Sequence, residues 1–122
     1  MTASNRLNGD AFGAATAISS DGGTVVAGAR RKPFDNVAFV DGPGAAYRYA
    51  RPVSGWAGAQ TETSTLAPFA GKDTNGSNVT PATTNGAFGA GVVMTGDAAT
   101  VAITGMAIDA ASSIAHPVVY VY

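Results

Sequence analysis

Short runs of small and β-branched apolar residues, separated by polar turn residues, follow one another along the chain. The run at 12–19 alternates loosely between apolar and polar positions, and the run at 24–29 follows it after Ser-Asp-Gly-Gly. Two such runs joined by a short polar segment that contains glycine are typical of a β-hairpin. We therefore predict two antiparallel strands over these residues.

Two further strands follow the predicted hairpin. In the run at 44–50, Tyr47 and Tyr49 lie two residues apart and so share one face of a strand. The run at 61–67 is rich in threonine, which favours strands. The sequence thus predicts a four-stranded antiparallel unit over residues 10–66.

The same pattern occurs a second time at a constant offset, which indicates a repeated structural unit. The second copy covers residues 86–122, and its last run matches Tyr47 and Tyr49 with Tyr120 and Tyr122. After that run the chain ends, one strand short of the first unit. The identical pairs are Ala11/Ala87, Phe12/Phe88, Gly13/Gly89, Ala14/Ala90, Asp21/Asp97, Thr24/Thr100 and Val25/Val101.

The N-terminal residues resemble the fourth strand of the first unit. The segments 2–7 and 61–66 both open with Thr, close with Leu and precede a Phe-Gly dipeptide. We therefore predict that 2–7 is an outer strand, which completes the second unit of a neighbouring chain.

Composition supports the all-β class and excludes several functions. Of 122 residues, 16 are glycine, 12% are charged, the net charge is −1 and none is cysteine. This composition favours strands and turns over helices, and its charge balance predicts no nucleic-acid partner. No apolar run approaches the length of a membrane span, so no membrane insertion is expected. Without cysteine there are no disulfides and no thiolate metal sites.

The order DAFGAATAISSDGGTVVAGA, GAAYRY, GW and TSTLA resembles the FG-GAP repeat, the blade of integrin-α-like β-propellers, in its bacterial form. The resemblance covers most of the chain and implies a propeller of four-stranded antiparallel blades, with two blades per chain. The family's calcium loop between the first two strands is replaced by SSDGGT and TGDAAT, which carry too few carboxylates for Ca²⁺. No cofactor is therefore expected.

Two blades per chain imply a ring that other copies complete, because propellers normally close with about four to eight blades. If 2–7 of each chain completes a blade of its neighbour, the contact is head to tail and closes into a ring. Three chains would supply six blades and four would supply eight. We expect a homotrimer first and a tetramer second. The alternative is a fragment of a longer propeller.

Three long loops, at 30–44, 67–86 and 106–116, are predicted on one face of the propeller, where binding residues usually lie. The first combines polar side chains with an aromatic platform, which suits a glycan or a peptide. The alternative interpretation is a solvated charge cluster, with phenylalanine side chains that hold the loop down. The candidate ligand-binding residues are Arg30, Arg31, Lys32, Phe34, Asp35, Asn36 and Asp41.

Metal binding is only weakly indicated. Asp73, Asn75 and Ser77 alternate as at the start of a calcium loop, but the later glycine and acidic residue are missing, so a solvated turn is favoured. His116 is the single histidine, so one chain cannot form a histidine cluster. The residues with predicted structural roles in the core and between blades are Phe12, Gly13, Phe88, Gly89, Tyr47, Tyr120 and Trp56.

These patterns predict a non-enzymatic, lectin-like binding or cell-adhesion module that recognises a glycan or a protein through its long-loop face. The alternative is a structural ring or assembly building block without a small ligand. No G-x-S-x-G motif or Ser/His/Asp order is present, so an enzyme is not expected. We expect an extracellular or cell-surface location. The first ten residues lack the pattern of a signal peptide, so a leader would have been removed.

Overall fold

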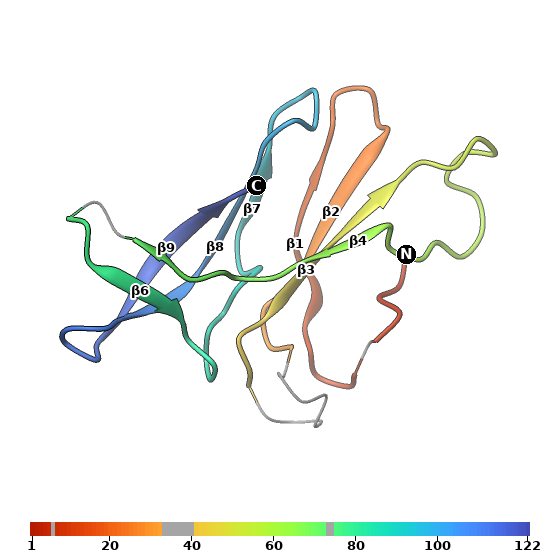
Figure 1. Ribbon diagram of the computed structural model, residues 1–122. Coiled ribbons are helices and arrows are strands. Elements are labelled where there is room, and N and C mark those ends of the chain that lie inside the picture. The colour runs from red at the N-terminus through yellow and green to blue at the C-terminus, as the bar shows by residue number, and fades with distance from the viewer. Residues whose placement is uncertain (6, 33–40, 73–74) are drawn as a thin grey trace.

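The structure, a computed structural model, describes residues 1–5, 7–32, 41–72 and 75–122 (Figure 1). These residues form nine β-strands and no helix, which confirms the all-β prediction. Accordingly, the described part of the chain contains no helix that could cross a membrane. The strands form two sheets with antiparallel pairing, which lie side by side (Figure 1).

The first sheet is a four-stranded meander that matches the predicted first unit. In β2 and β3, Val25 pairs with Tyr49 and Ala27 pairs with Tyr47, so these four side chains share one face. The fourth strand is shorter than the predicted 61–67, but the order and pairing of all four strands agree with the prediction. The strands are β1 Phe12–Ile18, β2 Thr24–Ala29, β3 Ala45–Ala50 and β4 Ser64–Leu66.

The second sheet contains the predicted second copy and two additional strands. Its β7, β8 and β9 pair as an antiparallel meander, like β1, β2 and β3 of the first sheet. The additional strands form a hairpin, and the second of them pairs with the far end of β8. The strands are β5 Gly71–Lys72, β6 Asn78–Pro81, β7 Val92–Met94, β8 Val101–Asp109 and β9 Ala115–Val121.

The prediction of loops throughout 67–86 and 106–116 was therefore wrong in part. Strand β8 continues to Asp109 and β9 begins at Ala115, so only a short turn joins them. The reason is that β6 supplies backbone partners, pairing Val79 with Asp109, which the sequence of β8 does not reveal.

The two equivalent hairpin turns show that the repeat in the sequence is also a repeat in the structure. In the β1–β2 turn, Asp21 Oδ1 accepts a hydrogen bond from the Gly23 amide at 2.8 Å. In the β7–β8 turn, Asp97 Oδ1 accepts one from the Ala99 amide at 3.0 Å. Each carboxylate also accepts a bond at 2.6 Å from the hydroxyl two residues earlier, and these bonds lower the pKa of both aspartates. Both aspartates thus stabilise the same local turn.

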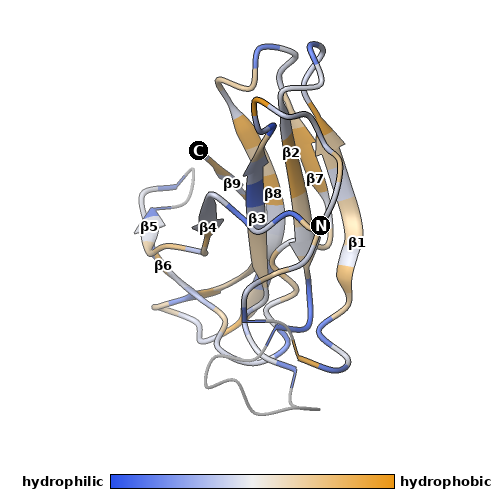
Figure 2. Ribbon diagram, turned by 90° about the vertical axis from the view of Figure 1, so that its right-hand side faces the viewer, coloured by the Kyte–Doolittle hydropathy of each residue, from blue (hydrophilic) through white to orange (hydrophobic). Residues whose placement is uncertain are grey.

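A hydrophobic cluster, which we call the inter-sheet core, joins the two sheets. In Figure 2 the central strands are coloured mostly as hydrophobic, and the turns at their ends mostly as hydrophilic. Phe88 is 1% exposed, and its ring centroid lies 5.2 Å from that of Tyr120 and 6.2 Å from that of Tyr122. The buried members are Val26, Ala46, Phe88, Val92, Val101, Ile103 and Tyr120.

A second cluster covers the opposite face of the first sheet, and we call this face the Tyr47–Tyr49 face. Both tyrosines are fully buried, and the ring of Phe12 lies 5.7 Å from that of Tyr47. Trp56 packs against this cluster and donates from Nε1 to the Gly22 carbonyl at 2.8 Å. The remaining buried members are Ala3, Ala27, Ala29 and Ala45.

The N-terminal segment lies on its own first sheet. The amide of Thr2 donates to the Gln60 carbonyl at 3.0 Å, and the amide of Ser4 donates to the Glu62 carboxylate. Tyr47 donates its hydroxyl hydrogen to Asn5 Oδ1 at 2.8 Å. Exchange of this segment between chains stays a prediction, since the structure shows where it lies in a single chain.

We expect the protein to lose stability above pH 10. Burial raises the pKa of Tyr47 and of Tyr49 from 10.0 to about 12. In the unfolded chain both ionise near pH 10, so unfolding becomes easier as pH rises from 10 to 12, while below pH 10 both states carry neutral tyrosines. Denaturant midpoints across this range test the expectation, and Tyr49→Phe should make the fall shallower. A constant midpoint from pH 10 to 12 would contradict it.

Candidate functional site

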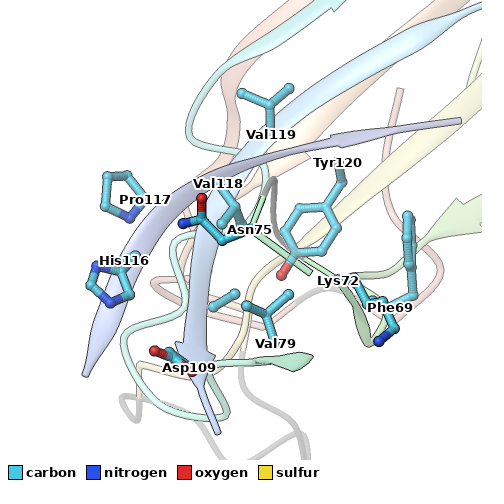
Figure 3. Close-up of a pocket in the computed structure, with 12 residues that line it drawn as sticks. Phe69, Lys72, Asn75, Val79, Asp109, His116, Pro117, Val118, Val119 and Tyr120 are labelled. Atoms are coloured by element: carbon cyan, nitrogen blue, oxygen red, sulfur yellow. The ribbon is translucent and has the colours of Figure 1, made fainter. Parts of the chain in front are cut away.

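Two hollows include predicted binding residues in their lining, and the larger of them lies where two of the predicted long loops meet. It has a volume of about 650 Å³ and opens between the β5–β6 hairpin, the end of β8 and the first half of β9 (Figure 3). Its position follows from the pairing of β6 with β8, which curls this part of the sheet. The lining residues are Phe69, Gly71, Lys72, Asn75, Val79, Ala107, Asp109, His116, Pro117, Val118, Val119 and Tyr120.

The floor of this hollow is apolar and aromatic. Val79, Val118 and Tyr120 point into it, and Phe69 stands at one side (Figure 3). Phe69 follows β4 and is 48% exposed, with its ring centroid 5.3 Å from that of Tyr120 and 5.5 Å from that of Tyr122. The two tyrosines therefore fix an aromatic ring that still presents half of its surface to solvent.

Polar groups of opposite charge lie at the edge of the hollow. The Asp109 carboxylate accepts hydrogen bonds from the Ala111 amide at 2.9 Å and from the Ser112 hydroxyl at 3.0 Å, and these bonds lower its pKa. The Lys72 ammonium donates to the Gly76 carbonyl at 3.3 Å. The lining of this hollow therefore includes one carboxylate and one ammonium group, which can accept and donate hydrogen bonds.

The size and lining of this hollow suit the binding of a small molecule. Pockets for small ligands commonly measure about 300–1,000 Å³ and combine an apolar lining with a few polar groups that set orientation. Among the described residues, no group of three or more His, Asp or Glu side chains could hold a metal ion. The arrangement therefore offers an aromatic surface and hydrogen-bonding groups to a bound molecule.

A second, smaller hollow of about 380 Å³ brings together three of the predicted binding residues, Arg30, Arg31 and Asp41. Arg31 Nε donates to Asp41 Oδ1 at 2.6 Å, and both side chains are well exposed. Asn85 and Ala87 complete the lining. This hollow is polar and shallow, and it joins the first predicted loop to the second.

Lys32 lies away from this hollow, although the sequence grouped it with the two arginines. Its side chain is buried, with 4% of the residue exposed, and its ammonium group donates to the Asn5 carbonyl. Burial lowers the pKa of Lys32, and the nearby Asp10 carboxylate partly offsets that effect. Lys32 thus anchors the N-terminal segment. The prediction failed because the long side chain turns inward to the Asn5 carbonyl, whose position near Lys32 cannot be read from the sequence.

The other predicted residues are distributed differently. Phe34, Asp35, Asn36 and Asp73 lie outside the described residues. Asn75 lines the larger hollow, whereas the half-buried Ser77 precedes β6.

Sequence reasoning missed the apolar floor of the larger hollow. Phe69 and Val79 belong to a segment predicted as a loop, and Val118 was assigned to an ordinary strand. One signal was present, since an aromatic and a β-branched residue inside a polar loop often pack against something. Their partner surface, however, comes from β9, far away in the chain.

Comparison of the chain with protein-family models, with curated proteins and with solved structures gave no match. The resemblance to FG-GAP blades accordingly stays a prediction.

Proposed function

We propose that this chain is a non-enzymatic, lectin-like binding module that recognises a small glycan, or a protein carrying one, through the hollow beside β9. One observation carries the proposal: residues of 67–86 and 106–116, two of the stretches that the sequence marks as the binding surface, supply most of the lining of the larger hollow. Residues of 30–44 supply most of the lining of the smaller one.

The lining of the larger hollow supports a glycan as the ligand. A sugar ring has apolar C–H faces that pack on an aromatic ring, and Phe69 is half exposed while held by Tyr120 and Tyr122. The hydroxyl groups of a sugar can pair with Asp109 as an acceptor and with Lys72 as a donor, both of which line the same hollow. The opposite charges of these two residues favour a neutral sugar.

We expect Phe69→Ala to weaken glycan binding by at least about tenfold, which corresponds to ~1.4 kcal/mol. The substitution removes the aromatic surface and leaves the rest of the hollow in place. The measurement is a glycan array with the purified chain, followed by titration of the best ligand. Val53→Ala is the matched control, because Val53 is fully exposed in a distant turn. Equal affinity of wild type and Phe69→Ala would reject this hollow as the site.

The smaller hollow provides a second, separable test. If the glycan binds there, Arg31→Ala lowers affinity and Phe69→Ala does not, because Arg31 lines only the smaller hollow. If no glycan on the array binds, the binding proposal fails and the structural alternative takes its place.

The proposal includes the blade interpretation. The two repeated sheets and the resemblance to FG-GAP blades support a propeller that several copies complete, a trimer first and a tetramer second, at the cell surface or outside the cell. One observation also favours the alternative of a structural ring without a small ligand: Val93, Val119 and Val121 are 66%, 61% and 57% exposed. Apolar residues gathered on one face commonly mark an interaction surface.

A further inference from the structure

The second sheet presents a row of apolar side chains that nothing in the described part of the chain covers. Val93 pairs with Ala102, and Ala102 pairs with Val121, so the three residues lie side by side across β7, β8 and β9. Val93 is 66% exposed and Val121 is 57% exposed. We call this row the valine row.

The internal repeat shows what covers the equivalent row on the first sheet. Ala102 occupies the position of Val26, which is fully buried in the inter-sheet core. The second sheet of the same chain covers Val26 with Phe88 and its neighbours. A surface like that of the second sheet therefore fits the valine row. Thr104 stands where the first sheet has Gly28, so packing at that position is less close than inside the chain.

The Tyr47–Tyr49 face has the equivalent residues in the equivalent register. Phe12 and Tyr47 correspond to Phe88 and Tyr120, whose side chains pack on the first sheet. A side chain at Gly89 would lie 2.5 Å from the Ala45 carbonyl oxygen, whereas one at the equivalent Gly13 would meet nothing within 4 Å. The Tyr47–Tyr49 face therefore lacks the sheet partner that its repeat has.

The hydroxyl groups of the repeated tyrosines show the same difference. Tyr122 donates its hydroxyl hydrogen to the carbonyl of Ala67, the residue after β4. The hydroxyl of the equivalent Tyr49 is buried and has no hydrogen-bond partner among the described residues. If residues 2–7 act as the strand equivalent to β4, the residue that follows them, Asn8, is equivalent to Ala67. The repeat then makes Asn8 the expected partner of the Tyr49 hydroxyl.

One sheet edge is also open in the second unit. Strand β3 pairs with β2 on one edge and with β4 on the other, whereas β9 pairs with β8 alone among the described strands. An unpaired edge offers a row of backbone donors and acceptors to another strand. By the repeat, Leu7 would face Val119 as Leu66 faces Ala46.

We propose that a second copy of this chain docks head to tail on the second sheet, with its residues 2–7 paired to the open edge of β9. Residues 2–5 leave the first sheet of their own chain, and the uncovered Tyr47–Tyr49 face of that copy packs on the valine row. The inference rests on the proposed assembly of blades and adds which surfaces meet. Release of the segment is local, because Ala3 is its one buried apolar side chain among the described residues.

The first experiment measures solution mass by light scattering coupled to size exclusion. We expect the wild-type chain to have a multiple of the single-chain mass and Val93→Asp/Val121→Asp to have the single-chain mass. Val53→Asp is the control for an added charge, since Val53 is fully exposed outside the valine row. If the double variant still assembles, the inference about which surfaces meet is overturned, whereas the proposed self-assembly stands. A wild-type chain of single mass at every concentration overturns both, and leaves glycan binding unaffected.

A cross-link tests the strand register without weakening the fold. The chain has no cysteine, so Leu7→Cys/Val119→Cys introduces one defined pair. Facing residues of antiparallel strands lie within the distance that a disulfide spans. Oxidation should join separate chains into a ladder on a non-reducing gel, and Val53→Cys/Val119→Cys should give none. A Leu7–Val119 disulfide within one chain, or no disulfide in the assembled protein, would overturn the proposed register.

Discussion

Phe88→Ala is expected to lower the free energy of unfolding by about 3–5 kcal/mol, the usual range for removing a large buried aromatic side chain. Phe88 is 1% exposed at the centre of the inter-sheet core, and its ring contacts those of Tyr120 and Tyr122 edge-on. Alanine there removes apolar burial, breaks both aromatic contacts and leaves a cavity between the sheets. Urea unfolding followed by tyrosine and tryptophan fluorescence measures the loss.

Phe69→Ala is the matched control for this prediction. Phe69 contacts the same two tyrosine rings but is 48% exposed. Because Phe69 is only half buried, its truncation removes less apolar contact than truncation of Phe88 does. We therefore expect the free energy of unfolding to fall by about 1 kcal/mol. If both variants lost the same stability, the inter-sheet core would not be the centre of the fold as described.

Gly28→Ala is expected to be nearly as damaging, with a loss of about 2–3 kcal/mol. A Cβ at this position would lie 2.0 Å from the Gly89 carbonyl oxygen, and that oxygen belongs to the backbone of the turn that leads into β7 of the second sheet. Since a backbone carbonyl cannot rotate away as a side chain does, the sheets must separate to admit the methyl group. Thermal and urea unfolding of the variant both measure this effect.

Gly71→Ala controls for the general effect of replacing glycine in a strand. A Cβ there would meet nothing within 4 Å. Alanine also restricts the unfolded chain more than glycine does, so the expected change is a gain of up to about 1 kcal/mol. A comparable loss in both glycine variants would mean that close contact between the sheets is not what requires glycine at position 28.

The binding region shows how far sequence reasoning reached. Arg31 and Asp41 were both predicted as ligand-binding residues of the first long loop, and in the structure they pair with each other at the smaller hollow. Lys32, adjacent to Arg31, turns inward to Asn5, and Phe69 forms part of a hollow whose other wall is β9. Charge and polarity place residues near a surface, but they do not reveal which surfaces meet.

The sequence by itself determined the all-β class, the repeat and the seven strands of the two copies. These features depend on local chemistry: alternation of apolar residues, and turn aspartates that bond to amides two positions away. Only the tertiary structure decided that β6 extends the second sheet, that the N-terminal segment covers the Tyr47–Tyr49 face, and that Phe69 borders a hollow. Each of these features depends on a contact between segments that are far apart in the sequence. The free energy of such a contact depends on the shape and the exposure of both surfaces, which neither segment shows by itself.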